Sequence, residues 1–211
     1  MSPVSSFIGY ALSIGAIELV PEGRKLKSGR MSPYFFNSGL FNTGKSILRL
    51  AEAYSCAIDK NFRPDPDVIF GPAYKGVAIA VAIAQFRNDE TGYAYNRKEA
   101  KDHGTKSLIE GGDIKGKKTL LVEDLVSLGM SSLSAVKEIR NADGIVNDCL
   151  VIVSYDFAEA KEAFKKANVE LHALTSVPVI LEEALKLGAL KQNEVDTIKE
   201  WFANPHSWGK K

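Results

Sequence analysis

The chain has 211 residues, of which 45% are hydrophobic and 25% are charged, a composition that suits one compact globular domain and argues against an intrinsically disordered chain. Its 27 Lys and Arg residues nearly balance its 26 Asp and Glu residues, so overall charge predicts neither a nucleic-acid partner nor a membrane-surface partner. Any anion site has to be local.

The N-terminal segment and the cysteines predict a cytoplasmic protein. The first basic residue, Arg24, follows the first apolar segment, which is the wrong order for a secretory signal. No apolar run reaches the roughly 20 residues that span a bilayer. Cys56 and Cys149 lie far apart without metal-ligand spacing, and we expect both to be buried free thiols.

Short apolar runs then alternate with helical patterns along the chain. Helices are predicted at 46–58, 76–86, 131–143 and 157–169, with two more near the C-terminus at 180–187 and 194–203. Strands are predicted between them at 68–70, 92–96, 119–124 and 149–155. Continuous apolar strands separated by helices are typical of a parallel sheet covered on both faces. The predicted fold class is therefore α/β, doubly wound, with ligands beyond the carboxyl ends of the strands.

Several side chains are expected to pack rather than to bind. The helix at 131–143 should turn Leu133, Val136 and Ile139 inward and end at Gly144. Trp201 has the character of a packing group, and His172, inside an apolar strand pattern, has that of a structural residue.

The strand at 119–124 ends in two acids, Glu123 and Asp124, and the next residues form a Ser- and Gly-containing loop, 127–132, before a helix. Because carboxylates are costly to bury, we expect both acids to emerge at the rim of the sheet. Hydroxyls, a glycine and a helix N-terminus together form a phosphate site, so the acids beside them indicate a sugar phosphate. The alternative is an ordinary helix capped by Ser131 or Ser132.

Two other segments favour the phosphate interpretation. "FGPAYKG", residues 70–76, brings two glycines and Lys75 to the end of the strand at 68–70. The hydrophilic segment 95–112 carries a cluster of basic side chains: Arg97, Lys98, Lys101, His103 and Lys106. Alone it would be a solvated loop, but beside a phosphate site it predicts a mobile lid over a polyanion.

"VEDLVSLGMSS" resembles the phosphoribosyl pyrophosphate (PRPP) motif of type I phosphoribosyltransferases, and "LKSGRMSPYFFNSGLF", "FGPAYKG" and "RKEAKDHG" resemble the orotate phosphoribosyltransferases in particular. The resemblance implies a type I fold over residues 1–211, with a small N-terminal hood (about 1–45) and a flexible lid (about 97–112). It also implies Mg²⁺-dependent transfer of ribose 5-phosphate from PRPP to orotate, giving orotidine 5′-monophosphate and pyrophosphate in pyrimidine biosynthesis. In this family the lid reaches the neighbouring subunit, which implies a homodimer.

The resemblance also assigns roles to individual residues. Lys27, Phe35, Phe36 and Ser127 would contact orotate. Lys101, His103 and Asp124 would be catalytic, and Mg²⁺ would be held mainly through PRPP, near Asp124, without a direct protein ligand. The residues that would bind PRPP are Tyr74, Lys75, Arg97, Lys98, Lys101, His103, Glu123, Asp124, Leu125, Val126, Ser127, Leu128, Gly129, Met130 and Ser131.

The sequence departs from the family pattern at three points. Leu128 and Met130 replace small residues of the phosphate loop, and a positive φ at Met130 would be strained. Asp156-Phe157 stands where some relatives have an Asp-Arg pair. The alternatives are a transferase for another base, and a non-catalytic PRPP-sensing regulator; intact Lys101 and His103 weigh against the latter.

Overall fold

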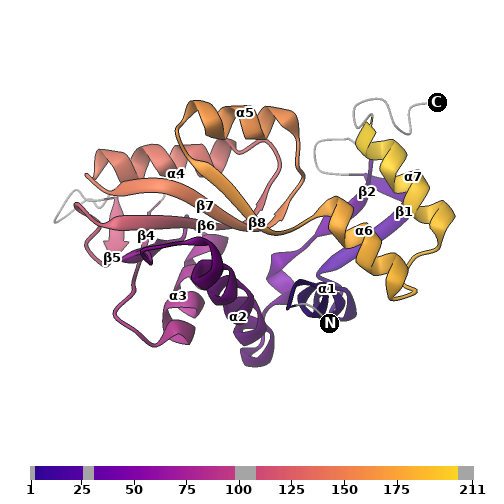
Figure 1. Ribbon diagram of the computed structural model, residues 1–211, viewed down its shortest axis with the longest axis horizontal. Coiled ribbons are helices and arrows are strands. Elements are labelled where there is room, and N and C mark those ends of the chain that lie inside the picture. Colours follow the sequence, from indigo (N-terminus) through magenta and orange to yellow (C-terminus); the bar gives the residue numbers. More distant parts are fainter. Residues whose placement is uncertain (1–2, 26–30, 98–107, 204–211) are drawn as a thin grey trace. The chain divides into compact units, whose positions relative to one another are not determined.

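The computed structural model describes residues 3–25, 31–97 and 108–203 (Figure 1). The chain forms two compact units, Met1–Phe41 with Val177–Lys211, and Asn42–Ser176. Within the described ranges, no helix is both long enough and apolar enough to cross a membrane.

The larger unit is built on a six-stranded sheet in the order β5-β4-β3-β6-β7-β8. Its strands are β3 (Val68–Phe70), β4 (Gly92–Asn96), β5 (Ile109–Gly111), β6 (Lys118–Val126), β7 (Ile145–Ser154) and β8 (Glu170–Ser176). All neighbours pair in parallel except β5, which runs antiparallel to β4. The predicted α/β class with a mainly parallel sheet is confirmed.

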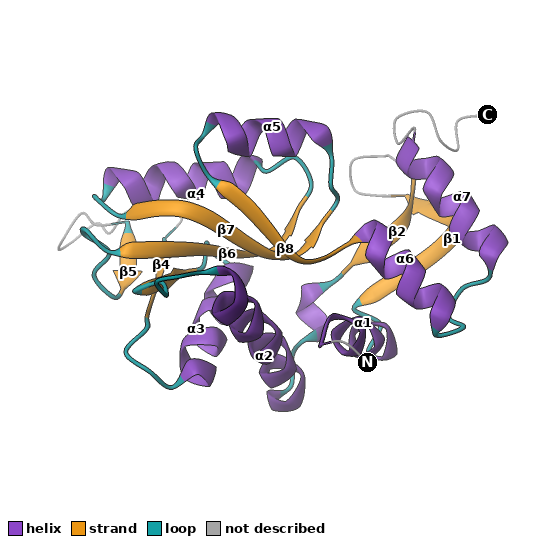
Figure 2. Ribbon diagram, viewed as in Figure 1, coloured by secondary structure: helices purple, strands orange, loops and turns teal. Residues whose placement is uncertain are grey.

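Helices cover both faces of this sheet. They are α2 (Gly44–Asn61), α3 (Lys75–Arg87), α4 (Met130–Asn141) and α5 (Ala158–Lys166). Figure 2 shows α4 and α5 on one face and α2 and α3 on the other. The apolar strands are therefore buried on two sides, which is why their sequences read as continuous rather than alternating hydrophobic runs.

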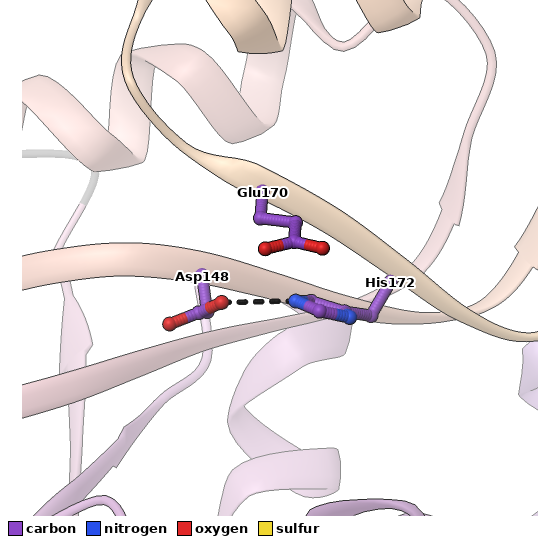
Figure 3. A group of neighbouring side chains, drawn as sticks. All are labelled: Asp148, Glu170 and His172. Carbon is purple, nitrogen blue, oxygen red and sulfur yellow. Dashed lines mark hydrogen bonds and ion pairs between the residues drawn. The ribbon is translucent and has the colours of Figure 1, made fainter. Parts of the chain in front are cut away.

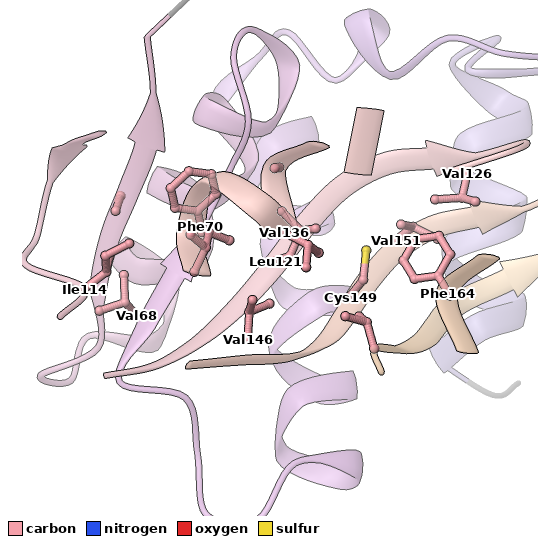
Figure 4. Packing of buried hydrophobic residues seen from close by; sticks show 14 of the residues in the cluster. Val68, Phe70, Ile114, Leu121, Val126, Val136, Val146, Cys149, Val151 and Phe164 are labelled. Atoms are coloured by element: carbon pink, nitrogen blue, oxygen red, sulfur yellow. The ribbon is translucent and has the colours of Figure 1, made fainter. Parts of the chain in front are cut away.

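The core between the sheet and α4 and α5 is continuous (Figure 4). Leu121 and Val151 from neighbouring strands meet Val136 of α4 and Phe164 of α5, and each is at most 1% exposed. Burying side chains of this size contributes roughly 1.5–3 kcal/mol each. This core holds the two helices, and with them the loops that precede each helix, in fixed positions.

Several local predictions need correction. The helix α4 ends at Asn141, before the predicted end at Gly144, and Asp143, with φ of 61°, adopts a left-handed conformation after it. Gly144 is required for another reason, because a Cβ there would lie 2.7 Å from Cγ2 of Ile139. Cys149 is buried as expected, but Cys56 is exposed, because it lies on the solvent side of α2.

The smaller unit combines both ends of the chain. It contains α1 (Pro3–Ser13), the antiparallel pair β1 (Ile17–Lys25) and β2 (Met31–Phe36), a short 3₁₀ helix η1 (Ser38–Leu40), α6 (Val177–Lys186) and α7 (Gln192–Ala203). Trp201 of α7 is 1% exposed, and its indole N–H donates to the carbonyl of Met31 at 2.9 Å. The packing role predicted for Trp201 is confirmed.

Candidate active site

Two loops follow neighbouring parallel strands and therefore leave the sheet at the same edge. Residues 71–74 follow β3, and residues 127–129 follow β6; Phe70 of β3 is paired with Leu121 of β6. This is the carboxyl edge, where ligands of open α/β sheets bind. The predicted phosphate loop and the predicted Lys75 loop are thus neighbours.

Close backbone contact shapes the loop after β3. A Cβ on Gly71 would lie 1.9 Å from the carbonyl oxygen of Gly76, and the N–H of Gly76 donates to the carbonyl of Pro72 at 3.0 Å. No side chain fits at this contact, so both glycines are needed for the loop to fold back on the first turn of α3. The turn places Lys75 at the start of α3, while Tyr74 is 73% exposed.

Asp124 is the most buried acid of the site, at 9% exposed. Its Oδ2 accepts a hydrogen bond from Nζ of Lys75 at 2.7 Å, and its Oδ1 accepts one from the N–H of Leu125 at 2.9 Å. The prediction that both acids emerge at the rim is wrong for Asp124, because β6 continues to Val126. Its burial is tolerated because the Lys75 ammonium compensates the charge.

Glu123 lies on the other face of the strand and is half-buried. Its Oε2 accepts hydrogen bonds from Oγ of Ser132 at 3.1 Å and of Ser131 at 3.4 Å. Burial raises the pKa of the Glu123 carboxyl, and the nearby Asp124 charge acts in the same direction. The backbone carbonyl of Glu123 accepts from the hydroxyl of Tyr54 at 2.7 Å, which anchors this part of β6 to α2.

The loop before α4 leaves a helix N-terminus without a side-chain cap. Gly129 is the N-cap, with φ of +79°, and makes no side-chain hydrogen bond to the helix. The alternative in which Ser131 or Ser132 caps α4 is therefore wrong; both hydroxyls donate to Glu123 instead. The first-turn N–H groups of a helix have no intrahelical acceptor, and the helix dipole adds positive potential there. The arrangement can bind a phosphate group.

The bulky side chains of Leu128 and Met130 do not occupy the space beside the phosphate loop. Met130 begins α4, and Gly129 takes the positive φ, so the strain considered for Met130 is absent. The side chains of Leu128 and Met130 are exposed. Ser127 is exposed and Leu125 half-buried, while Val126 packs in the core, so only the backbone of Val126 can reach a ligand.

The predicted lid is the segment that connects β4 to β5 in an antiparallel hairpin. The N–H of Arg97 donates to the carbonyl of Leu108 at 2.7 Å, and its guanidinium lies 3.4 Å from the carboxylate of Glu110. These contacts close the base of the segment. The remaining lid residues, Lys98, Lys101, His103 and Lys106, lie outside the described residues, as does Lys27 of the predicted base pocket.

Asn96 is a functional candidate that the sequence did not reveal. Its Oδ1 accepts from the N–H of Ala73 at 2.8 Å, and its Nδ2 donates to Glu138 of α4 at 2.6 Å. One amide thus joins the loop after β3, the strand that leads into the lid, and the helix that begins at the phosphate loop. A polar residue between an apolar strand and a basic segment was the only local signal.

The two predicted orotate-stacking rings differ in environment, because adjacent strand residues point to opposite faces. Phe36 is 9% exposed and packs against Phe41, with ring centroids 6.5 Å apart. Phe35 is half-buried, and the guanidinium of Arg24 lies 4.1 Å from its ring centroid. Phe36 is therefore a core residue, whereas Phe35 keeps an accessible ring.

Asp156 and Phe157 also have clear positions. Asp156 has φ of 62° and forms an ion pair with Lys161 at 2.7 Å. Phe157 occupies the N-cap position of α5, and its ring lies 5.6 Å from that of Tyr155. Neither residue supplies the cation that an Arg would bring at this position.

The parallel sheet, the paired acids and the uncapped helix N-terminus define a protein of the phosphoribosyltransferase class. The family profile described as "Phosphoribosyl transferase domain" matches residues 40–170. The chain is 35% identical over 195 residues to the orotate phosphoribosyltransferase of Acinetobacter baumannii, covering 86% of this chain and 88% of the relative. It is 42% identical over 159 residues to that of Nitrosococcus oceani, covering 74% and 71%. The chain belongs to the orotate phosphoribosyltransferase family.

Solved structures agree with this assignment. The crystal structure of orotate phosphoribosyltransferase from Francisella tularensis superposes with a TM-score of 0.76 at 29% identity, over 92% of this chain and 93% of that one. UMP synthase from Leishmania donovani, at 23% identity, shares the fold with a TM-score of 0.79 over 94% of this chain and 42% of its own. The predicted fold and family are confirmed.

Proposed function

We propose that this chain transfers ribose 5-phosphate from PRPP to orotate, giving orotidine 5′-monophosphate and pyrophosphate, as a step of pyrimidine biosynthesis in the cytoplasm. The observation that carries the proposal is the Lys75–Asp124 ion pair beside the uncapped N-terminus of α4. These groups supply a cation for pyrophosphate, a carboxylate for ribose hydroxyls and N–H donors for the 5′-phosphate.

The reaction breaks the bond between ribose C1 and a pyrophosphate oxygen, and pyrophosphate leaves with the bonding electrons. A ring nitrogen of orotate forms the new bond to C1 and loses its proton. Positive charge develops on the sugar and negative charge on the leaving group, so the protein has to stabilise separated charges more than it has to supply a nucleophile.

Lys75 and Asp124 are matched to these two charges. In the structure the Lys75 ammonium satisfies the Asp124 carboxylate, and the Lys75 side chain is 59% exposed. On PRPP binding, Lys75 would turn to the pyrophosphate while Asp124 accepts from a ribose hydroxyl. Glu123 would accept from the other hydroxyl. The ion pair thus holds the Asp124 side chain in place before the substrate arrives.

Mg²⁺ fits the site as a substrate-bound ion. Asp124 offers carboxylate oxygens beside the position proposed for ribose and pyrophosphate, and Mg²⁺ is commonly held by one or two carboxylates together with substrate oxygens. When bound, the ion would neutralise part of the negative charge on pyrophosphate. The carboxylate of Asp124 would orient the ribose toward the ion and would not itself enclose the ion.

The lid would complete the site. Arg97, Lys98, Lys101 and His103 would surround the pyrophosphate, with His103 donating a proton to it as it leaves. Closure would also exclude water that could hydrolyse PRPP. We propose a homodimer in which each lid serves the active site of the neighbouring subunit, as in the family that the sequence resembles.

Orotate would be contacted by Lys27, Phe35, Phe36 and Ser127. The accessible ring of Phe35 can pack on the flat base, whereas Phe36 would support it from the core. Because Phe157 replaces the Arg found in some relatives, the positive charge for the orotate carboxylate would come from Lys27.

The test is the loss of orotate absorbance when purified protein is mixed with orotate, PRPP and Mg²⁺, with uracil, adenine and hypoxanthine in parallel. Lys75→Ala and Lys101→Ala should each lower kcat/KM by about 10²-fold, since a hydrogen bond to a charged group contributes roughly 1.5–3 kcal/mol. Lys115→Ala is the matched control, because Lys115 is an exposed lysine paired with Asp143. Turnover of another base alone, or PRPP binding with no turnover, would overturn the proposal.

A further inference from the structure

A second cluster of polar side chains lies at the opposite edge of the large unit. Asp148 of β7 is paired in register with Glu170 of β8, and His172 lies two residues further along β8. Residues two apart on a strand point to the same face, so all three side chains converge on one side of the sheet (Figure 3). One ligand atom from each lies within 4.8 Å of the other two.

This cluster is separate from the phosphate loop. Asp148 is six residues before Ser154, which pairs with Val126 at the carboxyl end of β6. At about 3.3 Å per residue, the two sites are about 20 Å apart along the strand. None of the residues proposed to bind PRPP or orotate belongs to the cluster.

We propose that Asp148, Glu170 and His172 form a binding site for a zinc-class transition metal ion. One imidazole and two carboxylates are ligands that Zn²⁺ accepts, whereas Mg²⁺ prefers oxygen alone. Three protein ligands leave a fourth position for water or a small anion. The Nε2 of His172 already lies 2.9 Å from Oδ1 of Asp148, so small side-chain rotations would bring both atoms to metal-binding distance.

Rigid neighbours hold the three ligands in place. Asp148 and Glu170 are on adjacent hydrogen-bonded strands, so their backbone positions are fixed by the sheet. The ring of His172 packs edge-on against Phe62, with centroids 4.8 Å apart, and its side chain is 20% exposed. A preorganised set of this kind binds an ion without ordering new backbone.

A cavity of about 520 Å³ provides access to the cluster. Its walls include the three ligands, Phe62 and the segment that begins at Arg63, together with Lys118. Two of these groups are cations, but Arg63 is neutralised by an ion pair with Asp65 at 2.8 Å. Lys118 is exposed to solvent, so its charge is well screened. Glu170 is exposed as well, so the half-buried Asp148 carboxylate, whose Oδ1 lies 2.9 Å from Nε2, is the acidic group that acts most directly on the His172 nitrogen.

An ion here would join the edge strand β8 to β7, since β8 is the last strand of the sheet. The expected role is structural, and the metal should stabilise the fold without changing turnover. This outcome does not depend on the proposed transferase reaction, because binding and stability are measured without substrates.

The test is calorimetric titration of tag-free, chelator-treated protein with Zn²⁺, with thermal unfolding of the same samples. The native protein should bind one ion and unfold at a higher temperature in its presence. Asp148→Asn, Glu170→Gln and His172→Asn should each weaken binding at least tenfold, and Co²⁺ should give a visible absorption band that His172→Asn removes. Circular dichroism would verify that each variant is folded.

The chain has three histidines, so the matched control is His206→Gln, which should bind as the native protein does. Native-like binding by His172→Asn would overturn the site, and loss of binding in a His103→Asn variant alone would assign the ion to the lid. Absence of binding by the native protein would overturn the proposal outright.

Discussion

Substituting Gly129 with Ala tests whether contact between the phosphate loop and the core sets the geometry of the site. Gly129 has φ of +79°, and a Cβ there would lie 2.6 Å from Cε2 and 3.2 Å from Cδ2 of Phe164. Phe164 is 1% exposed and packed in the core, so its ring cannot move away at low cost. The new methyl group would push the loop outward and displace the first turn of α4.

Two effects add at this position. The left-handed conformation costs a non-glycine residue roughly 1–2 kcal/mol. Overpacking against a buried ring costs a further ~1–3 kcal/mol. We therefore expect Gly129→Ala to lower the free energy of unfolding by roughly 2–5 kcal/mol, and to raise KM for PRPP at least about tenfold, which corresponds to roughly 1.4 kcal/mol of lost binding.

Gly116→Ala separates the two effects. Gly116 has φ of +67°, but a Cβ there would meet nothing within 4 Å. This variant should lose only the roughly 1–2 kcal/mol of backbone strain and keep its KM. Urea unfolding followed by circular dichroism, with PRPP kinetics on the same preparations, measures both quantities.

A double substitution tests the assigned contact directly. Leu at position 164 lacks the ring atom nearest to the new methyl group, so Gly129→Ala should cost less in a Phe164→Leu background than in the native chain. Equal losses for Gly129→Ala and Gly116→Ala, or no relief in the Phe164→Leu background, would refute the reasoning.

Two further substitutions probe the buried polar groups. Burial raises the pKa of the Glu123 carboxyl in the folded state, so the free energy of unfolding of the native protein should decline as pH rises from near 4.5 upward. Glu123→Gln removes this dependence, so the urea midpoints of the two proteins should diverge across that pH range. A constant difference would contradict the raised pKa. Asn96→Ala should raise KM for PRPP, because the Ala73 N–H loses its acceptor and an unsatisfied donor costs roughly 1–3 kcal/mol. Asn193→Ala, at an exposed position, should leave the kinetics unchanged. Equal kinetics of the two variants would contradict the proposed link.

Hydrophobic periodicity predicted most of the central unit because its elements bury their own apolar faces. The helix expected at 46–58 is α2, with Leu50, Tyr54 and Ile58 all at most 1% exposed. The strands at 68–70 and 92–96 have the predicted bounds. These segments are set by local pattern, and the sheet needs only to bring them together.

The carboxyl end of β6 was not predictable in the same way. Asp124 should have ended the strand, because an isolated buried carboxylate is costly. Its compensating cation, Lys75, is 49 residues away in sequence. The sequence around Asp124 shows the cost of burying its carboxylate but not the distant lysine that compensates the charge. The strand therefore continues past the residue at which the local pattern predicts the rim of the sheet. The same reasoning explains why Trp201 was expected only to pack: the Met31 carbonyl to which its indole N–H donates is 170 residues away.

The polar contacts missed by the sequence are the ones that join separate parts of the site. Motifs identified the loop after β3, the lid and the phosphate loop individually, because each is a contiguous run of residues. Asn96 belongs to none of these runs, yet its amide contacts both Ala73 and Glu138. An amide can accept one hydrogen bond and donate another, so Asn96 can bind both the Ala73 N–H and the Glu138 carboxylate. An apolar side chain can do neither, and a carboxylate at this position could not donate to Glu138. Residues that couple motifs are therefore found by following hydrogen bonds between elements, and their loss should alter substrate binding before it alters the fold.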